Sequence, residues 1–425
     1  MLDIKFIRDN VEFVKENLTK RGKTEMIPWV DEVVDHYDEW LALKRQAEEL
    51  RHKRNVISEE INLLQKQKKD FSSKVKEIKV IPGKIKEVET QMDALSSKNN
   101  HLRFMIPNIL HPSVPIGKDA SENKVIKSMG KIPSFGFELQ NHVELTEQLG
   151  VADFDAGRKV AGQGFNYIFG KLALLDLALQ RYGLDFLLKN GFTVVVPPLL
   201  LNRQTLSGAV DIAAFGEVIY KIDQEDLYLA GTAEHPLVSM MRDKIIDVKK
   251  MPIKVCAVTP CFRKEIGGHG VDMKGLFRMH QFNKVEQVIF AKPENSFMLL
   301  EYMQKLTEKF FTSLKIPFRV VEICSGDLGG KFAKQYDIEA YFPRQKEYRE
   351  VTSAGNCTDY QARRLEIKYE ESGERHYVHI LNNTMVATSR AMVAILENHQ
   401  QKDGSIAVPK ALQKYTQFKK IEKAK

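Results

Sequence analysis

Two neighbouring runs, IKVCAVTPCFRKE at 253–265 and LFRMHQFNKVEQVIF at 276–290, decide the fold of the longer part of this chain. Both are rich in β-branched and aromatic residues, and the loop between them contains several glycines, which predicts a β-hairpin. Further β-rich runs lie at 193–197, 318–323 and 376–381, and helical segments are expected near 165–190 and 294–314. Successive strands with few helices between them favour an α+β fold with a mainly antiparallel sheet flanked by helices.

The predicted β-hairpin carries charge where a core is expected. Side chains alternate along a strand, so Arg263 and Glu265 share one face, and Arg278, Phe282 and Glu286 share another. Pairing about the middle of the loop would place Arg263 opposite Arg278. Opposed arginines destabilise a sheet unless an anion lies between them, and a triphosphate would serve. The alternative is a solvent-facing strand with ordinary surface charge.

The N-terminal region has a different pattern. From Trp29 to Lys69 there is neither glycine nor proline, which predicts one helix of roughly 60 Å. Apolar residues repeat every seven positions there and again from Ile78 to Leu102, so we expect an antiparallel coiled-coil hairpin that forms a protruding arm. A compact bundle is the alternative, although the dense charge outside the apolar positions disfavours it. Pro82 implies either a long tip or a kinked second helix.

These patterns divide the 425 residues into an N-terminal helical arm (1–105), a linker rich in proline and glycine (106–135) and a further domain (136–425) with a short basic C-terminal tail. The tail holds seven lysines from Lys402 onward and is expected to be solvated and disordered. The net charge of +8 and the pI near 9.0 favour a polyanionic partner.

Several function classes find no support. There is no GxGxxG and no GxxxxGK[ST] motif, so side chains rather than a glycine-rich loop would have to hold any nucleotide. The four cysteines are too few and too irregular for a disulfide framework or a CxxC-type zinc site, and Cys357 is expected to be a small packed residue. His269 and His280 are expected to be structural or solvent-facing. No apolar segment has membrane-spanning or signal-peptide length, and we expect a cytoplasmic protein.

Five motifs together resemble seryl-tRNA synthetases, a family of class II aminoacyl-tRNA synthetases. They are TAE at 232–234, CFRKE at 261–265, GLFRMHQFNKVE at 275–286, GNCTDYQARR at 355–364 and LNNTMVATSRAMVAILENHQ at 381–400. The heptad arm matches this family as well, so the resemblance covers nearly the whole chain. It implies an ATP-dependent ligase that converts L-serine to seryl-adenylate and transfers serine to the 3′ end of tRNA(Ser).

The resemblance also implies roles for individual residues. Arg263, Arg278 and Arg390 would be the catalytic residues. The ATP-binding set would be Arg263, Lys264, Glu265, Arg278, Phe282, Glu350, Val351, Thr352, Ser353 and Arg390. The serine-binding set would be Thr232, Ala233, Glu234, Arg263, Glu286, Asn382 and Thr384. Glu350 and Ser353 would hold Mg²⁺, and Glu286 could instead form only a buried ion pair with Arg263 or Lys284.

The implied partners are tRNA(Ser), bound through the arm, and a second copy of the chain. The helix before Gly191 and the strand that ends in Pro197-Pro198 would correspond to the family's dimer-forming motif. Three features depart from the family pattern: Val271 and Lys274 stand where arginines are common, TSAGN occupies 352–356, and LNNT occupies 381–384. The match is to the zinc-independent branch, so no zinc is expected.

Two other functions remain open at this point. A carrier-protein ligase with the same catalytic domain would lack the long arm. A non-catalytic nucleic-acid-binding relative would not need Arg263, Glu265, Arg278, Glu350 and Arg390.

Overall fold

The computed structural model describes residues 1–210, 218–265 and 275–423. The chain divides into two compact units, an N-terminal unit (Met1–Pro107) and a C-terminal unit (Asn108–Lys425). Within the described residues, no helix combines the length and the apolar character needed to cross a membrane.

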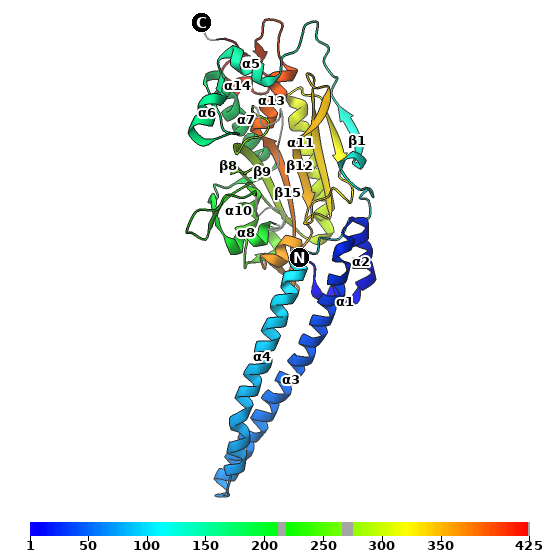
Figure 1. Cartoon of the computed structure of the whole chain (residues 1–425), viewed down its shortest axis with the longest axis vertical. Coiled ribbons are helices and arrows are strands. Elements are labelled where there is room, and N and C mark those ends of the chain that lie inside the picture. Colours follow the sequence, from blue (N-terminus) through cyan, green and yellow to red (C-terminus); the bar gives the residue numbers. More distant parts are fainter. Residues whose placement is uncertain (211–217, 266–274, 424–425) are drawn as a thin grey trace. The chain divides into compact units, whose positions relative to one another are not determined.

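The N-terminal unit is built around a helical hairpin. Helices α3 (Ile27–Lys66) and α4 (Ser72–Met105) lie side by side and antiparallel, joined by residues 67–71 (Figure 1). The short helices α1 (Ile4–Asp9) and α2 (Val11–Lys20) pack against α3, and a 3₁₀ turn (Thr24–Met26) leads into it. The predicted pair of long antiparallel helices is therefore confirmed.

An apolar seam joins the two long helices. Ile57 of α3 packs with Ile81 and Ile85 of α4 in one buried cluster, as the sevenfold repeat predicts. Ion pairs such as Arg51–Glu89 (2.6 Å) and Lys53–Glu77 (2.8 Å) flank the seam. Exposed pairs of this kind contribute about 0–1 kcal/mol each, so the apolar seam supplies most of the stabilisation.

Pro82 lies inside α4 rather than at the tip. The connection at 67–71 is short, so the alternative of a long tip is wrong. Proline has no N–H to donate to the preceding turn, and Pro82 is an exposed residue of the helix.

The C-terminal unit is organised by one large sheet with strand order β1-β10-β11-β12-β15-β9-β8-β4. Every neighbouring pair described in this sheet is antiparallel except β4 and β8. The prediction of a mainly antiparallel sheet is confirmed. The strands are β1 (Lys124–Met129), β4 (Thr193–Val194), β8 (Ile253–Phe262), β9 (Gln281–Ala291), β10 (Phe318–Glu322), β11 (Lys334–Phe342), β12 (Glu347–Asn356) and β15 (His379–Ala387).

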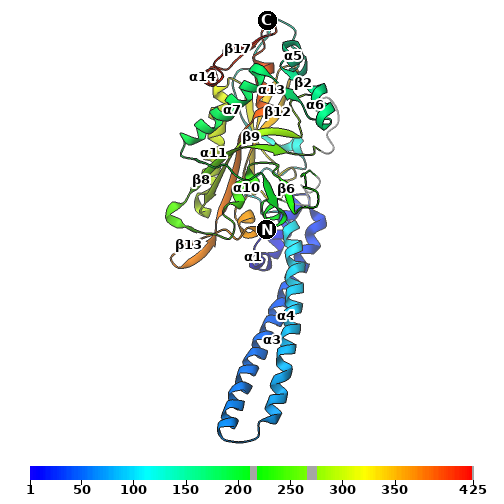
Figure 2. The ribbon, with the colours of Figure 1, turned by 90° about the vertical axis from the view of Figure 1, so that its left-hand side faces the viewer.

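Helices and shorter strands cover this sheet (Figure 2). The helices are α5 (His142–Leu149), α6 (Phe154–Ala161), α7 (Gly170–Leu188), α8 (Arg203–Ala209), α10 (Glu234–Ser239), α11 (Pro293–Ser313), α12 (Tyr360–Arg364), α13 (Thr388–Asn398) and α14 (Gln413–Thr416). The shorter strands are β2 (Ala152–Asp153), β3 (Tyr167–Ile168), β5 (Leu200–Asn202), β6 (Leu227–Leu229), β7 (Ile245–Asp247), β13 (Lys368–Glu371), β14 (Glu374–Tyr377), β16 (Ile406–Ala407) and β17 (Lys420–Ile421).

The alternation along β9 separates two cores. Val285 and Ile289 pack in a cluster with α7 and α11, whereas Val288 and Phe290 pack in another with α10 and α12. Lys284 and Glu286 share the parity of the second set, so they project toward the side of the sheet where α10 begins. This placement puts charged side chains on the floor of a cleft.

Two segments differ from expectation. Residues 124–129 of the expected linker form β1, which pairs with β10. The C-terminal segment is folded through Lys423, with Leu412 and Ile421 fully buried in the main core, so its description as a disordered tail is wrong. The lysines suggested a solvated tail, but the apolar residues between them anchor the segment.

Candidate active site

A cleft of about 380 Å³ opens on the α10 side of the large sheet. Its floor comes from β9, β12 and β15, and its walls come from the ends of β8 and α13 and from residues 327–332. The predicted site residues that line it are Thr232, Glu234, Arg263, Glu265, Arg278, Phe282, Glu286, Glu350, Val351, Thr352, Ser353, Asn382, Thr384 and Arg390. Residues that are distant in the sequence thus meet in one place.

Two predicted site residues, Lys264 and Ala233, do not line the cleft. The Nζ atom of Lys264 lies 5.8 Å from the centroid of the Tyr220 ring. Ala233 is fully buried at the start of α10, where it packs with Leu237 and Val238.

The predicted pairing of Arg263 with Arg278 is wrong. Cys261 pairs with Phe282, and the Arg263 amide donates to the carbonyl of His280 at 2.9 Å. The centre of the hairpin therefore lies one residue later in the chain than expected. Because moving the centre by one residue moves every cross-strand partner by two, Arg263 lies opposite His280 instead of Arg278. Arg278 lies outside β9, before its first residue, and still reaches the cleft.

Three arginines nevertheless converge on the cleft. The Nε atom of Arg263 donates to the Gly231 carbonyl at 3.0 Å, and its guanidinium carbon lies 5.6 Å from the centroid of the Phe282 ring. Arg390 donates to the Glu350 carbonyl at 3.1 Å and lies 3.2 Å from the Glu350 carboxylate. The Nε atom of Arg278 is buried and has no hydrogen-bond partner among the described residues. Such a donor suits an anionic ligand.

A second group of side chains surrounds Ser353 on β12. Asp337 on β11 lies opposite Ser353, and Gln335 donates to both of them at 3.0 Å. Partial desolvation in the cleft would raise the pKa of Glu350, although its side chain is 47% exposed, but Arg390, Arg263 and Lys284 together lower that pKa. Burial and the nearby Glu350 raise the pKa of Asp337 well above its usual range. This corner therefore combines oxygen ligands with mutual repulsion between carboxylates.

Glu234 is a buried carboxylate at the other end of the cleft. It forms an ion pair with Lys331 and accepts a hydrogen bond from Gln361 at 2.8 Å. Burial would raise the pKa of Glu234, but the Lys331 ammonium and the hydrogen bond from Gln361 act against it, and the pKa is lowered. Glu234 is therefore ionised near neutral pH.

Glu286 has the opposite electrostatic balance. Its carboxylate accepts from the Thr384 hydroxyl at 3.2 Å and lies 3.4 Å from the ammonium of Lys284. Burial raises the pKa of Glu286 despite Lys284. Two carboxylates in one small volume with pKa values pushed apart are typical of a functional site.

Two further polar atoms in the cleft are buried without a hydrogen-bond partner among the described residues. They are the Nδ2 atom of Asn382 and the Oγ1 atom of Thr352. Leaving a buried polar group unpaired costs about 1–3 kcal/mol, so these atoms suit contacts to a bound molecule.

Several cleft residues escaped the sequence reasoning. Lys331 follows two glycines, Gly329 and Gly330, a short signal that could have marked a loop near a ligand. Gln335 and Phe277 carried no local signal, whereas Lys284 was expected only as a possible ion-pair partner of Glu286, and the structure shows that pair. His235 lies next to Glu234, and burial lowers its pKa to about 3, so it is neutral near pH 7.

His280 and Cys357 were predicted to be structural rather than catalytic, and the structure describes both of them. The His280 ring stacks on Phe165, and its Nδ1 atom lies 2.5 Å from the Tyr220 hydroxyl, so its role is structural. Cys357 is fully buried, as predicted. His269, Val271 and Lys274 lie outside the described residues.

The cleft has two chemically distinct ends. Arg263, Arg278 and Arg390 surround a space beside the flat face of Phe282, which suits an aromatic base carrying phosphates. Glu234 and Glu286 mark the other end, which suits a small molecule with an ammonium group. This arrangement supports joining the two ligands by positioning and charge neutralisation.

Known proteins share this organisation. Residues 1–110 match the family described as seryl-tRNA synthetase N-terminal domain, and residues 219–399 match the tRNA synthetase class II core domain (G, H, P, S and T). A serine–tRNA ligase from Methanoculleus marisnigri is 47% identical over 418 residues, which cover 98% of each chain.

Two solved structures are also similar. The seryl-tRNA synthetase from Pyrococcus horikoshii complexed with ATP has a TM-score of 0.95 and 44% identity, with 100% of both chains covered. The cytoplasmic serine–tRNA ligase from Naegleria fowleri in complex with AMP has a TM-score of 0.89 and 33% identity, covering 100% of this chain and 99% of that one. The likeness extends over both units, and the chain belongs to the seryl-tRNA synthetase family.

Proposed function

We propose that this chain is a serine–tRNA ligase that forms seryl-adenylate from L-serine and ATP and then transfers serine to the 3′ end of tRNA(Ser). The observation that carries the proposal is the cleft, where three arginines and an aromatic ring lie beside two buried carboxylates. The full-length relatives named serine–tRNA ligase support the same activity.

The arginine end of the cleft would bind ATP. Phe282 would stack on adenine, Glu265 would accept from its amino group, and Arg390 would cover the opposite face and reach the γ-phosphate. Arg263 would contact the α-phosphate, and Arg278, whose Nε atom is free of described partners, would contact the γ-phosphate. The ATP-bound relative from Pyrococcus horikoshii supports this assignment. Val351 and Thr352 would line the nucleotide, whereas Lys264, which lies outside the cleft lining, would not contact it directly.

The carboxylate end would bind serine. Glu234 and Glu286 would receive the ammonium and hydroxyl groups, together with Thr232, Asn382 and Thr384, while Ala233 would contribute only backbone. Since Lys331 occupies Glu234 in the described structure, the substrate ammonium would compete with the lysine there. Alanine would leave the groups that contact the serine hydroxyl unpaired, which can cost about 10⁴-fold in selectivity.

Magnesium would bind at Glu350 and Ser353. The donor set fits, because Mg²⁺ prefers oxygen ligands and is usually held by one or two carboxylates together with substrate phosphates. The raised pKa of Asp337 next to Glu350 points the same way, since a cation would relieve their repulsion. When bound, Mg²⁺ neutralises charge on the triphosphate.

The chemistry needs no protein nucleophile. The serine carboxylate attacks the α-phosphorus, the bond to the β-phosphate oxygen breaks, and pyrophosphate leaves. Arg263 holds the attacking carboxylate and the α-phosphate together, and Arg278 and Arg390 offset the charge that develops on the leaving group. A hydroxyl of the terminal ribose of tRNA then attacks the acyl carbon and releases AMP.

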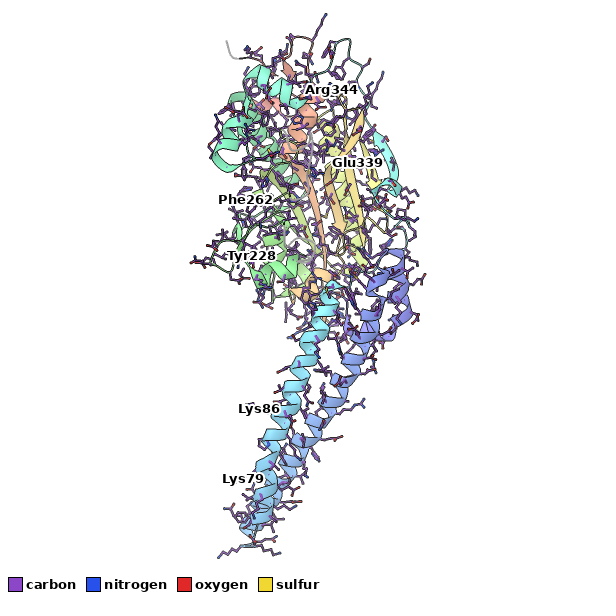
Figure 3. The ribbon with its side chains drawn as sticks, viewed as in Figure 1. Lys79, Lys86, Tyr228, Phe262, Glu339 and Arg344 are labelled. Carbon is purple, nitrogen blue, oxygen red and sulfur yellow. The ribbon has the colours of Figure 1, made fainter. Side chains whose placement is uncertain are left out.

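The arm of residues 1–105 would bind tRNA, and residues 136–425 would form the catalytic domain. Lys79 and Lys86 of α4 are one heptad apart and point away from α3 (Figure 3). Neither they nor Lys76 and Lys84 form an ion pair with any described residue, so their ammonium groups are available for phosphates. By analogy with the family, they would contact the long variable region of the tRNA.

A homodimer in the cytoplasm completes the proposal. Leu174 and Leu177 of α7 and Val196 after β4 are exposed by 48%, 57% and 94%. Large apolar side chains clustered on one helix and the following strand are typical of a protein interface. This is the segment that corresponds to the dimer-forming motif of the family.

Serine-dependent exchange of pyrophosphate into ATP tests the proposed activity. We expect exchange with serine and Mg²⁺, and at least about 10²-fold less with alanine or threonine. Absence of exchange with serine would contradict the proposal. Transfer to a phosphopantetheine thiol instead of tRNA would support the carrier-protein alternative.

A further inference from the structure

One buried pair of titratable side chains lies outside the roles assigned above. His142, the first residue of α5, is 7% exposed, and Glu397 near the end of α13 is fully buried. The His142 Nδ1 atom lies 3.5 Å from a carboxylate oxygen of Glu397. The Nδ1 atom of His142 and both oxygens of Glu397 have no hydrogen-bond partner among the described residues, so the two groups meet by electrostatic contact rather than by a hydrogen bond. A fully buried carboxylate in this state requires an explanation.

The other side of the imidazole identifies its protonation form. The Leu276 amide donates to the Nε2 atom of His142 at 3.2 Å. A ring nitrogen that accepts a hydrogen bond carries no proton, so the proton of the ring is on Nδ1, facing Glu397. The carboxylate therefore stabilises the tautomer that leaves Nε2 free to accept.

The Leu276 amide belongs to the segment that enters the cleft. Gly275 adopts a φ of +121°, and a Cβ atom there would lie 2.3 Å from His142 Nε2, so the ring and the backbone are in close contact. Phe277 lies between two arginines, with its ring centroid 3.8 Å from Arg349 and 5.3 Å from Arg390. Arg278 follows directly. Gly275–Arg278 therefore places one catalytic arginine and supports another.

The position of His142 is itself fixed. Gln140, two residues earlier, forms two backbone hydrogen bonds with the Gln400 side chain, at 3.0 and 3.1 Å. Asn141 closes a capping box with Glu144 at the start of α5. These contacts tie the start of α5 to the chain just after α13, the helix that carries both Arg390 and Glu397.

We propose that His142 is a positioning residue of the cleft. Glu397 fixes its tautomer, and its Nε2 atom anchors the Leu276 amide, so that Arg278 and the Phe277 support of Arg390 are in place for ATP. This inference rests on the proposed function, because its consequences are measured as changes in the use of ATP. Removal of a side chain that orients a ligand-binding group through one hydrogen bond changes affinity or activity by about 10–100-fold.

A matched pair of amides tests the proposal. Glutamine at position 142 can place its amide oxygen near the site of Nε2, whereas asparagine is one methylene shorter and cannot reach Leu276. We expect H142N to raise KM for ATP and lower kcat of pyrophosphate exchange by about tenfold each, with KM for serine within about twofold. We expect H142Q to restore most of both losses, and Glu397→Ala to act in the same direction as H142N.

The control is His399, a partly buried histidine just after α13, whose Nε2 atom contacts the Leu314 carbonyl at 2.9 Å. His399→Asn should lower thermal stability without changing the ratio of the two KM values. The proposal is overturned if H142N matches the wild type, if H142N and H142Q are equally impaired, or if His399→Asn reproduces the ATP effect. If the wild-type chain shows no pyrophosphate exchange, the proposed function fails. The role of His142 is then tested by calorimetry, which compares the ATP affinities of the wild type and H142N. Equal affinities of wild type and H142N, or no binding, overturn it.

Discussion

The hairpin and the cleft use charge in opposite ways. Along α3 and α4, lysines and glutamates are mostly exposed, and those that pair do so across water-accessible surface. In the cleft, Glu234, Glu286 and Lys284 are buried, and each depends on one or two specific neighbours. Exposed charges contribute little singly and are screened by salt, whereas a buried charge that loses its partner has a large cost.

This difference predicts how each region responds to change. The hairpin should bind a polyanion through many small, roughly additive and salt-sensitive contacts. The cleft should respond to single substitutions with large effects that depend on which ligand is varied. Single substitutions in each region therefore test whether the two kinds of charge behave differently.

The largest effect is expected for Arg390→Ala. Its guanidinium would neutralise charge on the triphosphate and now contacts Glu350 and Phe277. Loss of this group should reduce pyrophosphate exchange by about 10³-fold. Steady-state kinetics of pyrophosphate exchange would measure this loss. Arg375→Ala is the control, because Arg375 on the exposed strand β14 pairs with Glu370 on β13, outside the cleft. Equal effects of the two substitutions would contradict the assignment of the cleft.

A smaller effect, confined to one of the two substrates, is expected for Glu286→Gln. If Glu286 receives the serine ammonium, KM for serine should rise by about 10²-fold, with little change in KM for ATP. Serine titrations of the exchange rate would show this. An unchanged KM for serine would assign Glu286 to its ion pair with Lys284 alone.

The same substitution predicts a change in stability with pH. Burial raises the pKa of Glu286, so the unfolded chain loses this proton at a lower pH than the folded chain. Ionisation therefore lowers the free energy of unfolding as the pH rises from the ordinary glutamate range to the raised pKa. Without ligands, Glu286→Gln should remove this pH dependence, so the melting temperature of the variant relative to the wild type should rise as the pH increases from the ordinary glutamate range to pH 7, in addition to a constant cost from the buried Lys284 that loses its charged partner. A difference in melting temperature that falls with pH would contradict the sign.

The smallest effect per residue is expected for tRNA binding by the helical hairpin. Replacing both Lys79 and Lys86 by alanine should weaken tRNA binding several-fold and reduce the slope of log affinity against log salt by roughly 1–2. Filter binding over a salt series would measure the slope. Lys53→Ala is the control, because Lys53 already pairs with Glu77. A loss of binding with no change in slope would argue against phosphate contacts.

The two regions also differ in how far sequence predicted them. The long helices and their apolar seam follow from a local repeat, so Ile57 and Ile85 were found without knowledge of distant contacts. The pairing of β8 and β9 was misplaced by one residue in its centre, because the intervening loop does not fix the register. The partners of Glu234 could not be predicted, since Lys331 and Gln361 are 97 and 127 residues away in the chain. The family motifs supplied those cleft residues that the local patterns could not.

The proposed serine–tRNA ligase activity and the role of the arm are tested together by charging a tRNA(Ser) transcript with radiolabelled serine. One preparation contains the intact chain, and the other lacks residues 35–98. The account predicts that the intact chain forms seryl-tRNA, and that the shortened chain retains serine-dependent pyrophosphate exchange but loses charging. Charging by the shortened chain at the intact rate would contradict the role of the arm. Failure of the intact chain to charge the transcript, despite activating serine, would contradict the proposed function.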